Sequence, residues 1–425
     1  MLVVMKAQAT PDTIIRAMSE RRTHLMNSSN AAIIRLSVLV LLAFAGCRSH
    51  DFPQYPSDYR EYAYVTNGDS NTVTVLDVVD VRVDRELVVG QKPVAVAASP
   101  TRNEVYVVNS GAADGQGSVS IINAENNTVT GAIYVHRQPV SIEIDSTGDL
   151  AYVANSGSNS VSVLDLKARR EIAVIGAGEE PAAARLSPDN KTLVVANRRG
   201  NSVSLFDPAT RRVRAIFTGC PGASDAVILP DSSKAFVPCS AGHQIMVIAL
   251  AHAEVRPAQP GSAQLVPARP DRLEALLDVG QAPMQLALKP DGGEVFSLNS
   301  LSDSISEVIT TTDDVSGSTI IGDNPVRGLV TADNSLLYVA NFHTQYVAVY
   351  SIDDGRRLPA TQGGSIRVGD GPSALAFSSS GQLLFVVNSR SGDVAVVRTA
   401  TLSFFTLLPA GRAPNAVAVK AFKLP

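Results

Sequence analysis

The sequence contains no tryptophan, and aromatic residues make up only 5% of it. Aromatic platforms for stacking sugars are therefore scarce, which disfavours a polysaccharide ligand. There are three cysteines and no C-x-x-C pair, so neither haem attached through C-x-x-C-H nor a redox-active dithiol is expected. The motifs H-E-x-x-H and G-x-S-x-G are also missing, as is a glycine-rich phosphate loop, so we predict no catalytic residue and no resident cofactor.

One four-residue motif is repeated along the chain. It occurs eight times, as YVTN (64–67), YVVN (106–109), YVAN (152–155), VVAN (194–197), FVPC (236–239), FSLN (296–299), YVAN (338–341) and FVVN (385–388). The fourth positions lie 42, 46, 42, 42, 60, 42 and 47 residues apart. Each motif is a short apolar run followed by a polar turn and an alternating polar and apolar run, which indicates antiparallel strands. A period in the forties is typical of propeller blades.

A second signal, glycine or a substitute two or three residues before proline, precedes a further apolar strand in each repeat. It occurs at 90–93, 136–139, 178–181, 280–283, 322–325, 369–372 and 411–414, and is irregular around Gly219 to Ala223. The last such strand, Asn415 to Val419, has no motif after it, whereas the motif at Tyr64 has no such strand before it. The two ends therefore complete one blade. We predict an all-β, eight-bladed propeller of four-stranded antiparallel blades, closed by the C-terminal strand joining the N-terminal blade.

These motifs resemble the YVTN family of β-propellers from about Tyr62 to Val419. The resemblance implies a structural role for the motif asparagine, whose side chain is expected to hold the adjoining loop. This role falls on Asn67, Asn109, Asn155, Asn197, Asn299, Asn341 and Asn388. Cys239 replaces the asparagine of one repeat, and the better-known members have seven blades. WD40 repeats fit poorly because the chain has no tryptophan.

The N-terminal region has the features of an export signal. A basic residue, Arg35, precedes an apolar run of about ten residues, which is too short to span a bilayer. Ala45-Gly46-Cys47 resembles a bacterial lipobox, which implies that Cys47 is the lipidated first residue of the mature protein. The alternatives are cleavage after Ala43-Phe44-Ala45, which would release the protein, and a retained anchor. We expect a signal peptide over 1–46, with a possible true start at Met26, a tether over 47–60 and a propeller over 61–425.

Charge and cysteines bear on compartment and partners. Removing residues 1–46 changes the formal net charge from −4 to −7, which argues against nucleic acid as a partner. In an oxidising compartment Cys220 and Cys239 would be left as a pair on one face of a single blade, so we expect a disulfide there, with two unpaired thiols as the alternative. Arg48 after Cys47 is compatible with sorting to an outer membrane. We expect a monomeric, membrane-anchored protein facing the periplasm or the cell surface.

Polar residues stand out on the predicted inner strands, whose other positions next to the channel are mostly alanine or serine. These are Glu143, Arg185, Asp225, Gln285 and Arg327, from blades three to seven. Their alternating sign indicates bridges between neighbouring blades around a central channel. One interpretation is inter-blade ion pairs and hydrogen bonds. The other is a polar pocket for a small anionic or zwitterionic ligand, with the two arginines as anchors.

Two other features leave alternatives open. The proline-rich insertion from Ala251 to Glu274 is either a tolerated surface loop or a partner-binding arm. His136, His243 and His343 fall in predicted loops of alternate blades, so we predict no metal site.

Two functional hypotheses follow. The first is a lipid-anchored, non-catalytic scaffold that binds an envelope protein or a small ligand through its loops and channel. The second is a periplasmic cofactor-binding or enzymatic propeller, comparable to haem d1 domains, lactonases or quinohaemoprotein subunits.

Overall fold

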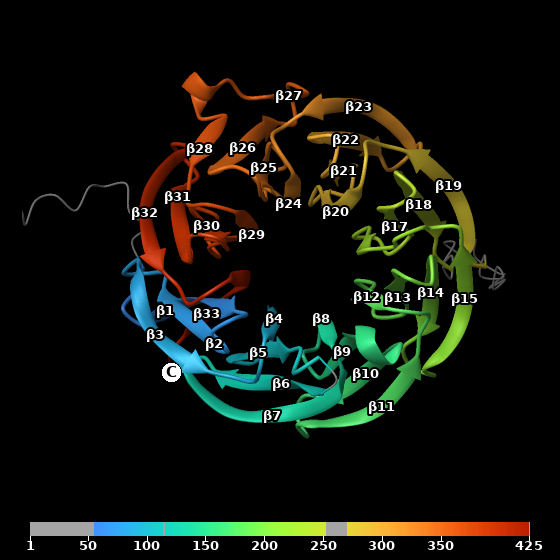
Figure 1. Ribbon diagram of the computed structural model, residues 1–425, viewed down its shortest axis with the longest axis horizontal. Coiled ribbons are helices and arrows are strands. Elements are labelled where there is room, and N and C mark those ends of the chain that lie inside the picture. The colour runs from blue at the N-terminus through green and yellow to red at the C-terminus, as the bar shows by residue number, and fades with distance from the viewer. Residues whose placement is uncertain (1–54, 114, 252–269, 425) are drawn as a thin grey trace, which may run out of the picture. The chain divides into compact units, whose positions relative to one another are not determined.

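The computed structural model describes residues 55–113, 115–251 and 270–424. The compact unit Pro56–Pro425 is built almost entirely of strands, with two short 3₁₀ turns, η1 (Ser156–Ser158) and η2 (Ala360–Gln362). Its strands form eight antiparallel sheets, which are arranged as blades around a ring (Figure 1). The all-β, eight-bladed prediction is confirmed.

The two inner strands of each blade follow the two sequence signals. The strands nearest the ring axis are β33 (Pro414–Lys423), β4 (Pro93–Ala98), β8 (Pro139–Ile144), β12 (Pro181–Leu186), β16 (Val227–Ile228), β20 (Pro283–Leu288), β24 (Pro325–Val330) and β29 (Pro372–Phe377), in blades 1 to 8. The second strands, which end on the motif residue, are β1 (Tyr59–Asn67), β5 (Glu104–Asn109), β9 (Leu150–Asn155), β13 (Leu193–Asn197), β17 (Lys234–Cys239), β21 (Glu294–Asn299), β25 (Leu336–Asn341) and β30 (Leu383–Asn388). β1 therefore begins just inside the predicted tether.

The outer half of each blade completes the antiparallel meander. The third strands are β2 (Thr72–Asp77), β6 (Gln116–Asn123), β10 (Ser160–Asp165), β14 (Ser202–Asp207), β18 (Gln244–Ala249), β22 (Ser304–Ile309), β26 (Tyr346–Ser351) and β31 (Asp393–Arg398). The outermost strands are β3 (Arg82–Val88), β7 (Thr128–Arg137), β11 (Arg170–Gly176), β15 (Arg212–Thr218), β19 (Arg272–Asp278), β23 (Asp314–Ile320), the split pair β27 (Arg356–Arg357) and β28 (Ser365–Arg367), and β32 (Ser403–Pro409).

The core lies between blades. There are eight clusters of buried apolar side chains, and each cluster joins two neighbouring blades. The aromatic residue that opens the motif is buried in these layers, as Tyr64, Tyr106 and Phe385 illustrate with 0% exposure. A four-stranded sheet cannot bury both faces alone, so the ring stabilises each blade by its neighbours.

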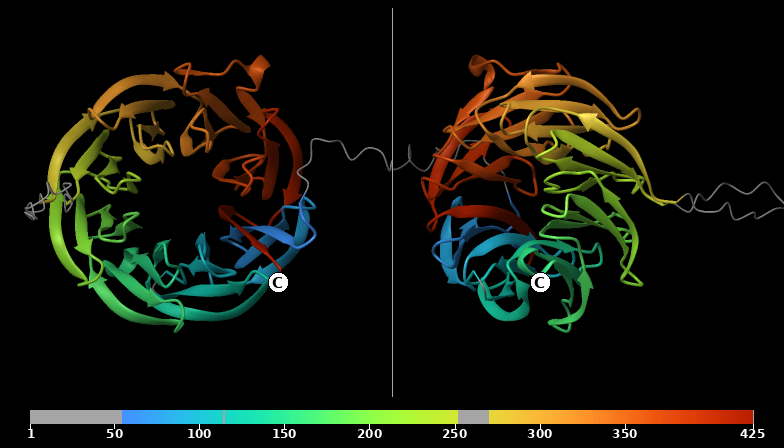
Figure 2. Two further views of the ribbon diagram at one scale, coloured as in Figure 1. Left: turned by 180° about the vertical axis from the view of Figure 1, so that it is seen from behind. Right: turned by 45° about the vertical axis from the view of Figure 1, so that its right-hand side comes forward.

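The ring is closed by the two ends of the chain, as predicted. β33 pairs with β1 along its whole length, from Tyr59 opposite Lys423 to Asn67 opposite Pro414. Figure 2 shows this C-terminal strand lying against the blue strands of blade 1. The closure pairs the inner edge of β1 and gives blade 1 its fourth strand.

Blade 5 departs from the regular pattern in two ways. Its inner strand β16 has only two residues, because the irregular segment before it is tied to the neighbouring strand instead. Cys220 and Cys239 form a disulfide with a Cα–Cα distance of 4.8 Å, which agrees with the predicted pairing. The insertion falls between β18 and β19, but β19 already begins at Arg272, and residues 252–269 lie outside the described residues.

The predicted signal peptide and Cys47 also lie outside the described residues. Within the described part of the chain, no helix combines the length and apolar character that a membrane crossing requires.

Candidate functional site

The five polar residues predicted for the channel lie on or beside the innermost strands of five successive blades. Glu143 lies on β8, Arg185 on β12, Asp225 just before β16, Gln285 on β20 and Arg327 on β24. We call this set the charged arc. The inner strands on the other side of the axis carry alanines at corresponding positions, as in Ala97, Ala376 and Ala418. The polar groups are therefore gathered on blades 3 to 7 of the ring in Figure 1.

Arg185 connects three blades. Its Nε donates a hydrogen bond to Asp225 Oδ1 at 2.8 Å, and its Nη1 donates to Glu143 Oε2 at 3.4 Å. The side chains of Arg185, Glu143 and Asp225 keep exposed fractions of 29%, 30% and 16%. Solvent therefore reaches these groups although they lie on the innermost strands.

The pKa values of these groups are shifted as expected for a strong and a weak ion pair. The charge of Asp225 raises the pKa of Arg185. Burial alone would raise the pKa of Asp225, but the Arg185 charge, its hydrogen bond and the Ala226 N–H together lower it. The pKa of Glu143 is raised because burial outweighs the attraction of Arg185. Asp225 is thus the stronger partner of Arg185.

The side-chain amide of Gln285 makes hydrogen bonds within its own blade and with the next blade. Its Nε2 donates to Leu286 O at 2.7 Å, and its Oε1 accepts the Gly328 N–H at 2.8 Å. The amide therefore fixes β20 against β24.

The side chain of Arg327 has no hydrogen-bond or ion-pair partner among the described residues. Burial lowers its pKa, while Asp225 raises it and Arg185 lowers it further. All of its guanidinium N–H donors are unused by the described protein. Of the two arginines predicted as ligand anchors, Arg185 is occupied by carboxylates and only Arg327 is available.

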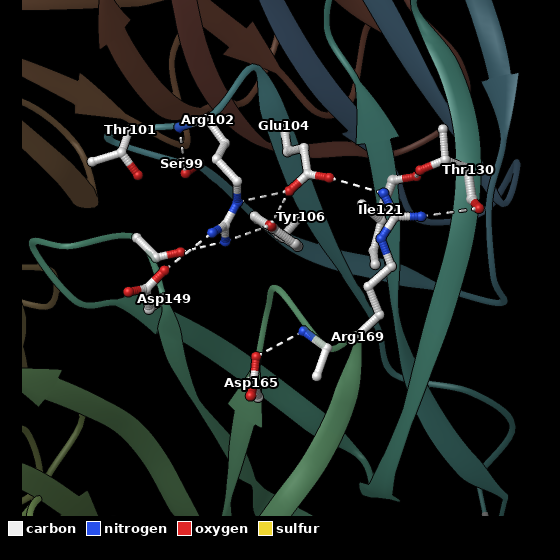
Figure 3. Close-up of polar contacts among 12 residues, drawn as sticks. Ser99, Thr101, Arg102, Glu104, Tyr106, Ile121, Thr130, Asp149, Asp165 and Arg169 are labelled. Carbon is white, nitrogen blue, oxygen red and sulfur yellow. Dashed lines mark hydrogen bonds and ion pairs between the residues drawn. The ribbon is translucent and has the colours of Figure 1, made fainter.

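A second polar cluster lies between blades 2 and 3 and was not predicted (Figure 3). Glu104 accepts hydrogen bonds from Arg102 Nε at 3.0 Å, Arg169 Nη2 at 3.0 Å and the Tyr106 hydroxyl at 2.5 Å. Arg102 also contacts Asp149 at 3.3 Å and the Gly148 carbonyl. These groups come from loops and strands whose proximity depends on how the blades meet, so no local sequence signal identifies them.

The cluster around Glu104 differs from the charged arc in how its charged groups are hydrogen-bonded. Burial and the neighbouring Glu104 raise the pKa of Tyr106 to about 12. The pKa of Glu104 is lowered in spite of burial, because the Tyr106, Arg102 and Arg169 side chains donate to its carboxylate. Every charged group in the cluster has a partner in the protein. The cluster therefore holds blades 2 and 3 together.

The motif asparagines lie where their side chains can hold the strand ends. Asn155 Nδ2 donates to Ser162 Oγ at 2.9 Å, and Asn197 Nδ2 donates to Ser204 Oγ at 3.0 Å. Asn197 Oδ1 also accepts the Gly178 N–H at 3.0 Å, and a Cβ on Gly178 would lie 2.7 Å from Asn197 Cγ. Glycine is therefore needed at this position of the linker. Nδ2 bonds of the other motif residues are made by Asn67, Asn109, Asn299, Asn341 and Asn388.

The structure does not bring the three histidines together into one site. His136 lies on the outer strand β7 of blade 2, not in the predicted loop of blade 3, and its Nε2 is 3.6 Å from Glu171. His243 Nδ1 accepts the Ala282 N–H at 3.1 Å, and His343 Nδ1 is 3.2 Å from Asp323. In the described ranges, no three His, Cys, Asp or Glu side chains are close enough to hold a metal ion.

Comparisons with known proteins agree with the fold. Residues 326–403 match the family model described as "Lactonase, 7-bladed beta-propeller". A comparison with curated protein sequences found no match.

Similar solved structures include dihydro-heme d1 dehydrogenase NirN in complex with DHE, with a TM-score of 0.65, 16% identity, and coverage of 86% of this chain and 76% of that chain. AztD from Citrobacter koseri has a TM-score of 0.63, 13% identity, and coverage of 86% and 99%. The hydrazine synthase of Kuenenia stuttgartiensis has a TM-score of 0.52, 21% identity, and coverage of 80% and 92%. These likenesses, together with the closed ring of eight sheets, establish that the chain is a β-propeller.

Proposed function

We propose that the protein is a lipid-anchored propeller of the cell envelope that binds a small ligand or a partner without catalysing a reaction. The observation that carries this proposal is Arg327. A guanidinium group with unused donors beside a complete ion-pair set can hold a ligand. It cannot act as a general acid or base near neutral pH, because arginine stays protonated.

Export is supported by the disulfide. Disulfides persist in oxidising compartments, and the buried pair Cys220 and Cys239 makes such a bond. The anchor itself is proposed at Cys47 from the lipobox-like sequence.

The topology indicates which side of the ring would be free for a partner. We define the loop face as the end of the ring where the second strands finish on the motif residues. β1 starts at Tyr59 at the opposite end and pairs there with Lys423, the last residue of β33. A tether from Cys47 would therefore join the ring at the face opposite the loops, and the loop face would be accessible.

The loop face offers side chains typical of protein contacts. Leu301 is 67% exposed and Tyr346 is 43% exposed. The Arg390 guanidinium lies 4.5 Å from the centre of the Phe342 ring. Aromatic residues and arginine are enriched at the energetic centres of interfaces, so this sector of blades 6 to 8 is the proposed partner surface.

Crosslinking in the native envelope, followed by mass spectrometry, tests the proposal. We expect the wild type to fractionate with membranes and to yield crosslinked peptides from the loop face, whereas Cys47→Ala is released. Membrane fractionation that is unchanged in Cys47→Ala would exclude lipidation. Partner crosslinks confined to the opposite face would contradict the proposed binding surface.

The second candidate is a cofactor-binding or enzymatic propeller. The raised pKa of Glu143 favours it, because such a carboxyl can exchange protons nearer to neutral pH. The lactonase family match and the likeness to NirN fit the same candidate. A Soret band in protein purified from its own host, or hydrolysis of lactones that is lost in Glu143→Gln, would favour this candidate over a scaffold.

A further inference from the structure

Two groups of opposite charge in the charged arc retain unused binding capacity. The Arg327 guanidinium group makes no hydrogen bond or ion pair with the described residues. Asp225 uses only one oxygen, since its Oδ1 accepts both the Arg185 Nε–H at 2.8 Å and the Ala226 N–H at 2.9 Å. Its Oδ2 accepts no hydrogen bond in the described part of the chain and is not among the buried unpaired atoms, so it faces solvent.

The two groups are separated by one intervening blade. Asp225 belongs to blade 5 and Arg327 to blade 7, with Gln285 of blade 6 between them. The side-chain amide of Gln285 is hydrogen-bonded to Leu286 and Gly328 and carries no charge. It therefore neutralises neither Asp225 nor Arg327. Asp225 and Arg327 do not form an ion pair, which means that no N···O distance between them is 4.0 Å or less. Each nevertheless influences the pKa of the other.

The charge balance of the arc restricts the ligand. Glu143 and Asp225 are matched by Arg185 and Arg327, so the arc is formally neutral. A simple anion next to Arg327 would meet the Asp225 carboxylate, and a simple cation next to Asp225 would meet two guanidinium groups. A ligand that carries both charges avoids both repulsions and completes the alternation of sign.

We propose that the charged arc binds a small zwitterion, with the ligand carboxylate on Arg327 and the ligand ammonium on Asp225. Arginine suits the carboxylate because its planar fork can donate two parallel hydrogen bonds. The free Oδ2 of Asp225 suits an ammonium donor. The corresponding positions on the inner strands of the other three blades are alanine, as in Ala97, Ala376 and Ala418, so no competing charge lies at these positions. This inference rests on the proposed binding role of the ring axis, but not on the lipid anchor.

Isothermal titration of the soluble protein from Arg48 onwards, joined to a cleavable purification tag, tests the ligand class. The probes are glycine, β-alanine, γ-aminobutyrate and 5-aminovalerate, which separate the two charges by increasing lengths. Acetate, butyrate and butylamine supply one charge each. We expect one of the zwitterions to bind at least ~10-fold more tightly than any of the three single-charge probes, because each lost charge contact is worth about 1.4 kcal/mol or more.

Variants separate the two contacts. Arg327→Gln should weaken the best zwitterion ~10-fold or more, and Asp225→Asn should do the same while keeping the Ala226 N–H bond. Arg199→Gln removes an exposed arginine, with 78% side-chain exposure, on the loop face and should leave binding unchanged. Near-ultraviolet circular dichroism and the melting temperature check that each variant is folded.

Three outcomes would overturn the inference. Binding of acetate or butyrate as tight as that of every zwitterion, together with no effect of Asp225→Asn, would make Arg327 a simple anion site. Binding that persists in Arg327→Gln would place the site elsewhere. If none of the probes binds the folded wild type at millimolar concentration, the small-zwitterion assignment is wrong, although partner binding in the envelope would still be measured independently by crosslinking.

Discussion

Lys420 is an ammonium group buried in the strand that closes the ring. It is 8% exposed, and its Nζ donates to the Ser99 carbonyl at 2.8 Å. No carboxylate forms an ion pair with it in the described part of the chain. Burial lowers its pKa below 10.5. A buried charge with one neutral partner opposes folding.

We predict that Lys420→Met stabilises the protein at pH 7 by about 1 kcal/mol, because it removes this desolvation penalty and keeps the chain volume. The folded protein loses the Lys420 proton at lower pH than the unfolded chain, whose lysine keeps its ordinary pKa of 10.5. Between these two values the unfolded chain binds more protons, so the wild type gains stability as pH rises. The advantage of Lys420→Met should therefore shrink as the pH rises toward 10.5, as measured by urea unfolding.

Lys423→Met is the matched control for this experiment. Lys423 lies on the same strand but is exposed, so its replacement should change stability little and without this pH dependence. Destabilisation by Lys420→Met at pH 7 would mean that the Ser99 contact outweighs the burial of the charge.

At the scale of the strand and its linker, blade 5 uses a covalent bond where blade 4 uses a hydrogen bond to the motif asparagine. In blade 4, Asn197 on β13 accepts the N–H of Gly178 from the linker. In blade 5, Cys239 at the end of β17 is bonded to Cys220 in the linker. Both arrangements tie the segment before the inner strand to the end of the second strand, and the disulfide compensates for the short β16.

Removal of the disulfide should therefore lower stability measurably. For a sequence separation of 19 residues, the double variant Cys220→Ala/Cys239→Ala should lose about 3 kcal/mol, because the unfolded chain is no longer constrained. Thermal unfolding with and without reductant measures this loss. The wild type should become less stable in reductant, and the variant should not respond. An equal response of both proteins would show that the bond is not formed in solution.

The strands were predictable because their signals are local. Apolar runs, turn residues and the proline that begins every inner strand except β16 lie within a few residues of one another. The short β16 was signalled only by the irregular segment around Gly219. The outer strand of blade 7 is split into β27 and β28, and its position could not be predicted because it depends on pairing with β26.

At the scale of the whole ring, the blade count and the closure followed from the unpaired first motif and the last strand, which complete each other. The members of the charged arc were also predictable from polar residues at alanine-rich positions. Their pairing was not, because it depends on distances between blades. Only the structure shows that Arg185 is occupied by Asp225 and Glu143, whereas Arg327 is not. The cluster around Glu104 was missed for the same reason.

The central claim is that the ring axis is a binding site that depends on Arg327. Native mass spectrometry of the protein purified from the envelope of its own host tests it most directly, with Arg327→Gln purified in parallel. We predict that the wild type carries a non-covalent adduct of small mass, that the adduct is lost in Arg327→Gln, and that the sample shows no Soret band. A wild type without an adduct, an adduct that survives in Arg327→Gln, or a bound haem would contradict the account.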